Sequence, residues 1–239
     1  IGGIGDFVWH TFFGIEAGID ALLSPTHVLL ALGAAIVVSG QLHAIWYRDT
    51  RVAKIHTIPV ICSFAFTFMV LTFMVQFLHP FYNPWLIEEF RSTNEIYQGT
   101  GVAENIILTG IFMGLLLSTW RYWKFPLGSF SLILGLNVLG TTLMRGAYYE
   151  LIPAAILGGI IIDILYQIFR GGNHASKHRI RVFGILAPIA LFTVYTAVLV
   201  LTYGTWWSVH FLSGSILITG IVGGLMTYLV MTPDDAYFR

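Results

Sequence analysis

The residues best suited to chemistry lie near the start of the chain, in a stretch that is otherwise largely apolar. Asp6 and His10 are four positions apart, so a helix through them places both side chains on one face. Ser24 and Pro25 are typical of a helix start, with Ser as N-cap and Pro at the first helical position. His27 is then expected in the first turn of a second helix. A carboxylate and two imidazoles that meet where two helices are joined form a candidate metal site.

Two further acids lie between these residues. Asp20 falls near the face of Asp6 if the first helix continues, whereas Glu16 points away from His10 on a straight helix. We therefore rank Asp20 above Glu16 as a fourth ligand. The alternative is an interfacial helix whose polar groups face water or lipid headgroups. Carboxylate and imidazole ligands without a thiolate suit copper, zinc or non-haem iron, and they do not select among the three.

The composition is that of a polytopic membrane protein. Of the 239 residues, 56% are hydrophobic and only 10% are charged, and the mean hydropathy is +0.79. The net charge of zero gives no argument for nucleic-acid binding. The single cysteine, Cys62, excludes a disulfide framework and a thiolate-based metal site. Because the chain begins with Ile1 rather than Met, we expect that a leader was removed or that the start is missing.

Apolar runs predict an all-α bundle of about seven transmembrane helices that forms a single domain over residues 1–239. An interfacial or partial helix in residues 1–25 precedes the spans, which we expect at 26–47, 55–79, 101–122, 127–144, 149–169, 180–203 and 208–231. No soluble domain is left over. Glycines within the spans, among them Gly159 and Gly223, predict close packing between helices.

Basic residues orient this bundle, because they gather in alternate connections. They are Arg48, Arg51 and Lys54 after the first span, Arg121 and Lys124 after the third, and Arg170, Lys177, Arg179 and Arg181 after the fifth. The positive-inside rule then places these connections and the C-terminus in the cytoplasm and residues 1–25 on the outer side. We expect an integral protein of a prokaryotic plasma membrane.

Two glutamates lie on the predicted outer side at the start of apolar spans. Glu104 is expected in the first turn of the third span, and Glu150 at the start of the fifth, close to Arg145. Ionisable groups in a bilayer are costly and persist mostly where they pair or do work. The two acids are therefore candidates for a proton relay beside the metal, with a salt bridge to Arg145 as the structural alternative.

Three more ionisable residues have a functional and a structural interpretation. His210 opens the last span and is a further candidate beside the metal, while His79 ends the second span; both positions also suit residues that anchor a helix at the membrane surface. Asp163 lies deeper, in the inner half of its span. It either bonds to a neighbouring helix through Tyr or Ser or belongs to a proton path.

The N-terminal pattern resembles a known family. Asp6-x-x-Trp9-His10, the acid at Asp20 and the turn Ser24-Pro25-Thr26-His27 resemble the C subunit of the copper membrane monooxygenases, the particulate methane and ammonia monooxygenases. His10-Thr11-Phe12 is similar to a second version of that pattern. More weakly, Ile152-Pro153-Ala154-Ala155 running to Asp163, and Gly220 to Pro233, look like stretches of the A subunit.

This resemblance implies that Asp6, His10 and His27 are copper ligands. The chain departs from the family in having one copy of the motif, a longer connection between the histidines and no cupredoxin-like domain. We expect this longer connection to bring Glu16 or Asp20 near the metal, which the family does not predict.

The function implied is that of an integral membrane subunit that binds copper at its outer face and oxidises a small apolar substrate with dioxygen. Such a subunit needs the lipid bilayer and other membrane subunits, in a homo- or hetero-oligomer. Two alternatives are a non-catalytic accessory subunit of a membrane complex and a small proton-coupled transporter, which would use Glu104, Glu150 and Asp163 at successive depths.

Overall fold

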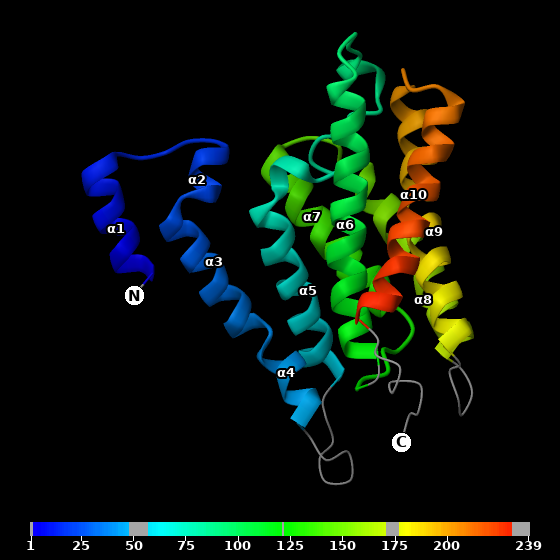
Figure 1. Ribbon diagram of the computed structural model, residues 1–239, viewed down its shortest axis with the longest axis horizontal. Coiled ribbons are helices and arrows are strands. Elements are labelled where there is room, and N and C mark those ends of the chain that lie inside the picture. Colours follow the sequence, from blue (N-terminus) through cyan, green and yellow to red (C-terminus); the bar gives the residue numbers. More distant parts are fainter. Residues whose placement is uncertain (1, 48–56, 121, 171–176, 231–239) are drawn as a thin grey trace. The chain divides into compact units, whose positions relative to one another are not determined.

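The computed structural model describes residues 2–47, 57–120, 122–170 and 177–230 (Figure 1). Within these ranges all regular structure is helical, which confirms the predicted all-α class. The basic residues Arg48, Arg51, Lys54 and Arg121 lie outside the described residues. Contacts divide the chain into two compact units, Ile1–Phe77 and Leu78–Arg239, and each unit is considered by itself.

The first unit holds the predicted metal ligands. Its helices are α1 (Gly2–Phe13), α2 (Ile19–Leu23), α3 (Pro25–Val38), α4 (Gly40–Tyr47) and α5 (Thr57–Met74), followed by the 3₁₀ turn η1 (Gln76–Leu78) at the junction. Helix α1 packs beside α3, and both α3 and α4 pack on α5 (Figure 1). Asp6 and His10 therefore face the beginning of α3.

The first predicted span is not one straight helix. Helices α3 and α4 meet at Ser39 with a bend of 47°. A serine followed by a glycine, here Ser39 and Gly40, is a common site for a helix kink. The carbonyl oxygen of Val38, at the bend, accepts a hydrogen bond from the Ser63 hydroxyl of α5. The Val38 carbonyl at the break between the two helices therefore has a hydrogen-bond donor.

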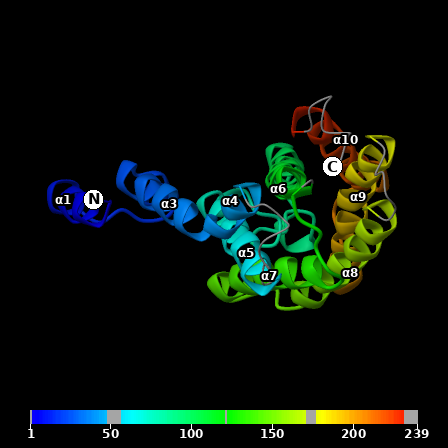
Figure 2. The same ribbon diagram turned by 90° about the horizontal axis from the view of Figure 1, so that it is seen from below.

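The second unit contains the 3₁₀ turn η2 (Glu88–Phe90) and the helices α6 (Ile96–Trp120), α7 (Ser129–Arg145), α8 (Leu151–Arg170), α9 (Lys177–Tyr203) and α10 (Val209–Val230). Helix α7 packs on α8, α8 on α9, α9 on α10, and α10 on α6 (Figure 2). The edge-to-face contact of Phe112 on α6 with Phe130 on α7, with ring centroids 6.0 Å apart, joins the two ends of this series.

Five described helices are long and apolar enough to cross a membrane, namely α5, α6, α8, α9 and α10. The bent pair α3–α4 makes a sixth if it counts as one span, and α7 is apolar but has only 17 residues. The protein is thus an integral membrane protein. Helix α6 begins at Ile96, earlier than predicted, because the side-chain oxygen of Asn94 accepts a hydrogen bond from the Ile96 amide at 3.0 Å. Glu104 consequently lies about two turns into the helix rather than in its first turn.

Asp163 has a structural partner at the start of α7. The N-cap of α7 is Gly128, which has no side chain to accept the first helical amides. The Asp163 carboxylate on α8 accepts these donors instead, from the amides of Phe130 and Ser131 at 3.0 Å and from the Ser131 hydroxyl at 2.6 Å. One turn earlier, a Cβ on Gly159 would lie 2.5 Å from the Ser131 Cα, so only glycine permits this approach. The bond to a neighbouring serine is the structural alternative that the sequence predicts for Asp163.

We expect Asp163→Asn to destabilise the second unit by about 2 kcal/mol. The side-chain amide has one acceptor oxygen, whereas three donors of Phe130 and Ser131 bond to the carboxylate. Thermal unfolding in detergent measures the loss. Ser131→Ala, which removes only the hydroxyl donor, is the matched control and should cost less. Equal losses in the two variants would contradict this assignment.

Candidate metal centre

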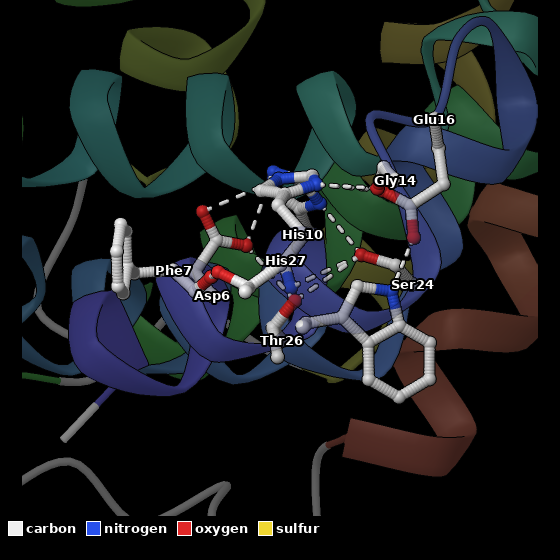
Figure 3. Close-up of polar contacts among 10 residues, drawn as sticks. Asp6, Phe7, His10, Gly14, Glu16, Ser24, Thr26 and His27 are labelled. Atoms are coloured by element: carbon white, nitrogen blue, oxygen red, sulfur yellow. Dashed lines mark hydrogen bonds and ion pairs between the residues drawn. The ribbon is translucent and has the colours of Figure 1, made fainter.

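The candidate ligands lie on two neighbouring helices of the first unit, α1 and the start of α3. Helix α1 spans Gly2–Phe13, which confirms that Asp6 and His10 are one turn apart on a helix. Ser24 is the N-cap of α3 and Pro25 its first residue, as predicted, so His27 lies in the first turn. Because α1 packs beside α3, the three side chains come together (Figure 3).

Both imidazoles turn the same nitrogen toward Asp6. His10 Nε2 lies 3.6 Å from Asp6 Oδ2, and His27 Nε2 lies 3.6 Å from Asp6 Oδ1. These distances are too long for hydrogen bonds. They do suit two ligands of one ion, since atoms about 2.1 Å from a tetrahedral metal are about 3.4 Å apart. In the described part of the chain this is the one group of three potential ligand residues whose donor atoms all lie within 4.8 Å of one another.

The other nitrogen of each imidazole is held from behind. His10 Nδ1 lies 3.0 Å from the carbonyl oxygen of Gly14, which can only accept, so His10 carries its proton on Nδ1. His27 Nδ1 lies 2.6 Å from the hydroxyl of Ser24. A metal-binding histidine usually has such a partner, which fixes the ring and leaves the opposite nitrogen free for the ion. Both Nε2 atoms are placed in this way.

The carboxylate of Asp6 is also oriented. The hydroxyl of Thr26, in the first turn of α3, donates a hydrogen bond of 2.9 Å to Asp6 Oδ1 (Figure 3). The side chains of Asp6, His10 and His27 are between 22% and 32% exposed. The group is therefore preorganised and still open to a further ligand.

Glu16, not Asp20, lies beside the cluster. Its Oε2 atom is 3.3 Å from His10 Nδ1, and the indole N–H of Trp9 donates a hydrogen bond to its other oxygen. His10 Nδ1 forms its hydrogen bond with the carbonyl oxygen of Gly14. Glu16 Oε2 forms no hydrogen bond, but its negative charge attracts the N–H of the imidazole. Asp20 is exposed on α2 and is not a member of the cluster.

The reason for this exchange is the reversal of the chain at Gly14. Gly14 has φ +84°, a left-handed conformation that favours glycine, and its amide bonds to His10 O at 3.0 Å where α1 ends. The chain then turns back and carries Glu16 to the rear of His10. A glycine directly after Phe13 is a helix-stop signal that argues against the straight helix used to rank the two acids. The supporting contacts of Ser24 and Thr26 are further features that the sequence pattern did not predict.

The candidate relay residues lie in the second unit. Glu104 is buried and accepts a hydrogen bond of 2.8 Å from the indole of Trp85. Glu150 is exposed, and hydrogen bonds from its own backbone and from the Tyr203 hydroxyl lower the pKa of its carboxyl. His210 is exposed in the first turn of α10.

Arg145 does not pair with either glutamate. Its guanidinium lies over the ring of Tyr82, 5.2 Å from the centroid. Among the residues that the structure describes, it forms no ion pair with Glu104 or Glu150. The salt bridge that the sequence offered as the structural account of these acids is therefore not present there.

His79 has a structural environment. It is only 2% exposed, its Nδ1 accepts a hydrogen bond of 3.3 Å from the Phe81 amide, and its Nε2 donates one of 3.3 Å to Asn137 Oδ1. Both nitrogens are engaged, so the neutral imidazole has none left for a metal. Burial lowers the pKa of His79 from 6.5 to about 4.

This depressed pKa predicts a pH dependence of stability. Below pH 6.5 His79 is protonated in the unfolded chain, but in the folded chain it stays neutral down to about pH 4. The free energy of unfolding therefore falls as the pH falls from 6.5 to about 4. The loss is of the order of 3 kcal/mol in total. In thermal unfolding, His79→Gln should flatten the dependence between pH 7 and 4, while His210→Gln, at an exposed site, should leave it unchanged. Parallel curves for wild type and His79→Gln would refute the prediction.

Comparison of the chain with family models, with curated proteins and with solved structures finds no match in any of the three. The case for a metal centre therefore rests on the geometry of Asp6, His10 and His27. The fold itself defines an integral membrane helix bundle.

Proposed function

We propose that the protein is a membrane subunit that binds a transition-metal ion, with copper as the leading candidate, through Asp6, His10 and His27. The observation that carries this proposal is the convergence of two Nε2 atoms on the two oxygens of Asp6 while both Nδ1 atoms are held by other groups. The Nε2–Oδ distances of 3.6 Å are longer than hydrogen bonds and suit an ion shared by the three side chains.

The types of the ligand atoms limit which metal ions the site can bind. Two imidazoles and one carboxylate suit copper, zinc and non-haem iron, and they disfavour magnesium or calcium, which prefer oxygen ligands. Copper(II) binds most tightly among the divalent ions of the first transition row, so a nitrogen-rich site that is open to solution favours it. The resemblance of the N-terminal pattern to the copper membrane monooxygenases points the same way.

The reaction that this site fits is the oxidation of a small apolar substrate with dioxygen. Copper held by Asp6, His10 and His27 would supply the chemistry for binding and reducing dioxygen. His10 and His27 would hold the ion together with Asp6, which the Thr26 hydroxyl keeps in place, and the partial exposure of all three side chains leaves room for a further ligand. The exposed aromatic residues Phe7, Phe12 and Phe13 of α1 offer an apolar surface for the substrate or for a partner subunit.

Because the chain offers no evident route for electrons, we infer that partner subunits supply them. The distribution of basic residues supports an outer location for the cluster and a cytoplasmic C-terminus. A membrane-impermeant chelator added to intact cells tests this orientation, because it removes the metal only if the site faces outward.

We expect near-stoichiometric metal in the protein purified in detergent or nanodiscs, measured by mass spectrometry, and a nitrogen-ligated Cu(II) signal in EPR if the metal is copper. His10→Ala and His27→Ala should each abolish binding, since each removes one of only three ligands. His210→Ala, an exposed histidine of the second unit, is the control and should retain the metal.

Loss of binding in the control, or metal content that is unchanged in His10→Ala and His27→Ala, would contradict the assignment. A protein that folds and assembles without metal would instead favour the accessory-subunit alternative. Zinc or iron in place of copper would retain the site and change the chemistry.

Glu16 should contribute to the metal affinity without binding the ion. Because it stabilises His10 with its proton on Nδ1, we expect Glu16→Ala to weaken metal binding by about 10- to 100-fold in a chelator competition, and Glu16→Gln to weaken it less. Asp20→Asn is the matched control, since Asp20 is exposed outside the cluster. If Glu16→Ala and Asp20→Asn bind equally well, Glu16 has no part in positioning His10.

A further inference from the structure

A second unusual group lies in the other unit, under a cover of indole rings. Glu104 is 1% exposed on the buried face of α6. A Cβ on Gly101, one turn earlier, would lie 2.8 Å from the ring of Trp207 and 3.2 Å from Trp85. The absence of a side chain at Gly101 therefore lets both indoles lie against the helix next to Glu104.

This indole cover, formed by Trp85 and Trp207, is held in place by hydrogen bonds between two loops. The Trp206 indole donates to the carbonyl oxygen of Trp85 at 2.8 Å, and the Thr205 hydroxyl donates to that of Leu86 at 2.7 Å. Trp85 also packs on Tyr97, with ring centroids 5.0 Å apart. The carboxyl of Glu104 is thus closed off on its loop side by residues that are themselves anchored.

The polar partners of Glu104 are too few for a carboxylate. Oε1 accepts the single hydrogen bond from Trp85, and the buried Oε2 has no donor. In the described part of the chain no Lys, Arg or His forms an ion pair with it. Among the described residues, Tyr195 of α9 is a titratable group that interacts electrostatically with Glu104. Its hydroxyl donates a hydrogen bond of 2.7 Å to the carbonyl oxygen of Pro80 and is not directed at Glu104.

Another acid of the same unit is equally buried but has a fuller set of hydrogen-bond donors. Asp163, also 1% exposed, accepts three hydrogen bonds through both of its oxygens. A buried charge without a countercharge or a full set of donors is strongly unfavourable, and the usual escape is to bind a proton. A proton on Oε2 removes the charge of Glu104 and leaves Oε1 free to accept the hydrogen bond from Trp85.

We propose that Glu104 is a proton-binding site of the helix bundle, closed by the indole cover, and that its carboxyl is neutral in the resting protein. Exchange of this proton requires displacement of Trp85, which among the described residues is the group that forms a hydrogen bond with the carboxyl. Glu104 and the indole cover all belong to the second unit.

The infrared spectrum tests the protonation state directly. At neutral pH the wild-type protein should show the carbonyl stretch of a protonated carboxylic acid, which shifts when glutamate is labelled with ¹³C and is absent from Glu104→Gln. This variant has the shape of the neutral acid and keeps the acceptor for Trp85, so it should fold; the isotope shift assigns the band to glutamate even if it does not. Glu150→Gln, at an exposed carboxyl, should retain the band. A wild-type spectrum without it overturns the proposal.

Dicyclohexylcarbodiimide, an apolar reagent, tests the cover. The O–H of a protonated carboxyl adds across one C=N bond of the reagent, and the product rearranges to an N-acylurea, so the peptide gains the mass of one reagent molecule with no leaving group. We expect Trp85→Ala to label several-fold faster at Glu104 than wild type. Equal rates would show that the indole cover does not control access to the carboxyl.

Discussion

The structure is governed by the need to pair every polar group inside a chain that has little access to water. In the apolar interior a donor or acceptor without a partner is destabilising, because it has lost the hydrogen bond that it forms with water in the unfolded chain. The break between α3 and α4 is paired by Ser63, and the start of α7 is paired by Asp163. The imidazole of His79 uses both nitrogens. Where this rule is obeyed, the residue has a structural role that its contacts fully explain.

Departures from the rule occur at both candidate sites, and also at Asn105 and at the indole nitrogens of Trp120, Trp123 and Trp207. At Asp6 the acid and the imidazoles face one another at 3.6 Å, which is a spacing for a shared ion rather than for direct bonds. At Glu104 one oxygen has no donor. Asp163 and Glu104 are equally buried acids on helices of the same unit, yet only the first has the partners of an ionised group. Burial alone therefore does not distinguish these two acids, and the number of hydrogen-bond donors does.

The sequence predicted much of this because its signals were local. Long apolar runs gave the helices, and Ser24-Pro25 gave the start of α3 with His27 in its first turn. Gly159 and Gly223 mark close approaches between helices, as expected. The exchange of Asp20 for Glu16 could not follow from a straight-helix assumption, because the reversal at Gly14 decides it. The partners of Asp163 and Glu104 come from distant segments, which helix periodicity does not reveal.

The bend at Ser39 also sets the height of the first span. At 1.5 Å per residue, the 14 residues of α3 and the 8 of α4 would measure about 33 Å if straight. With α4 inclined by 47° the pair measures about 29 Å along the axis of α3, close to the 30 Å thickness of a hydrocarbon layer. His27 lies in the first turn of this pair and Tyr47 at its other end. Counted as one span along the axis of α3, the pair therefore separates the imidazole from Tyr47 by about the thickness of the hydrocarbon layer.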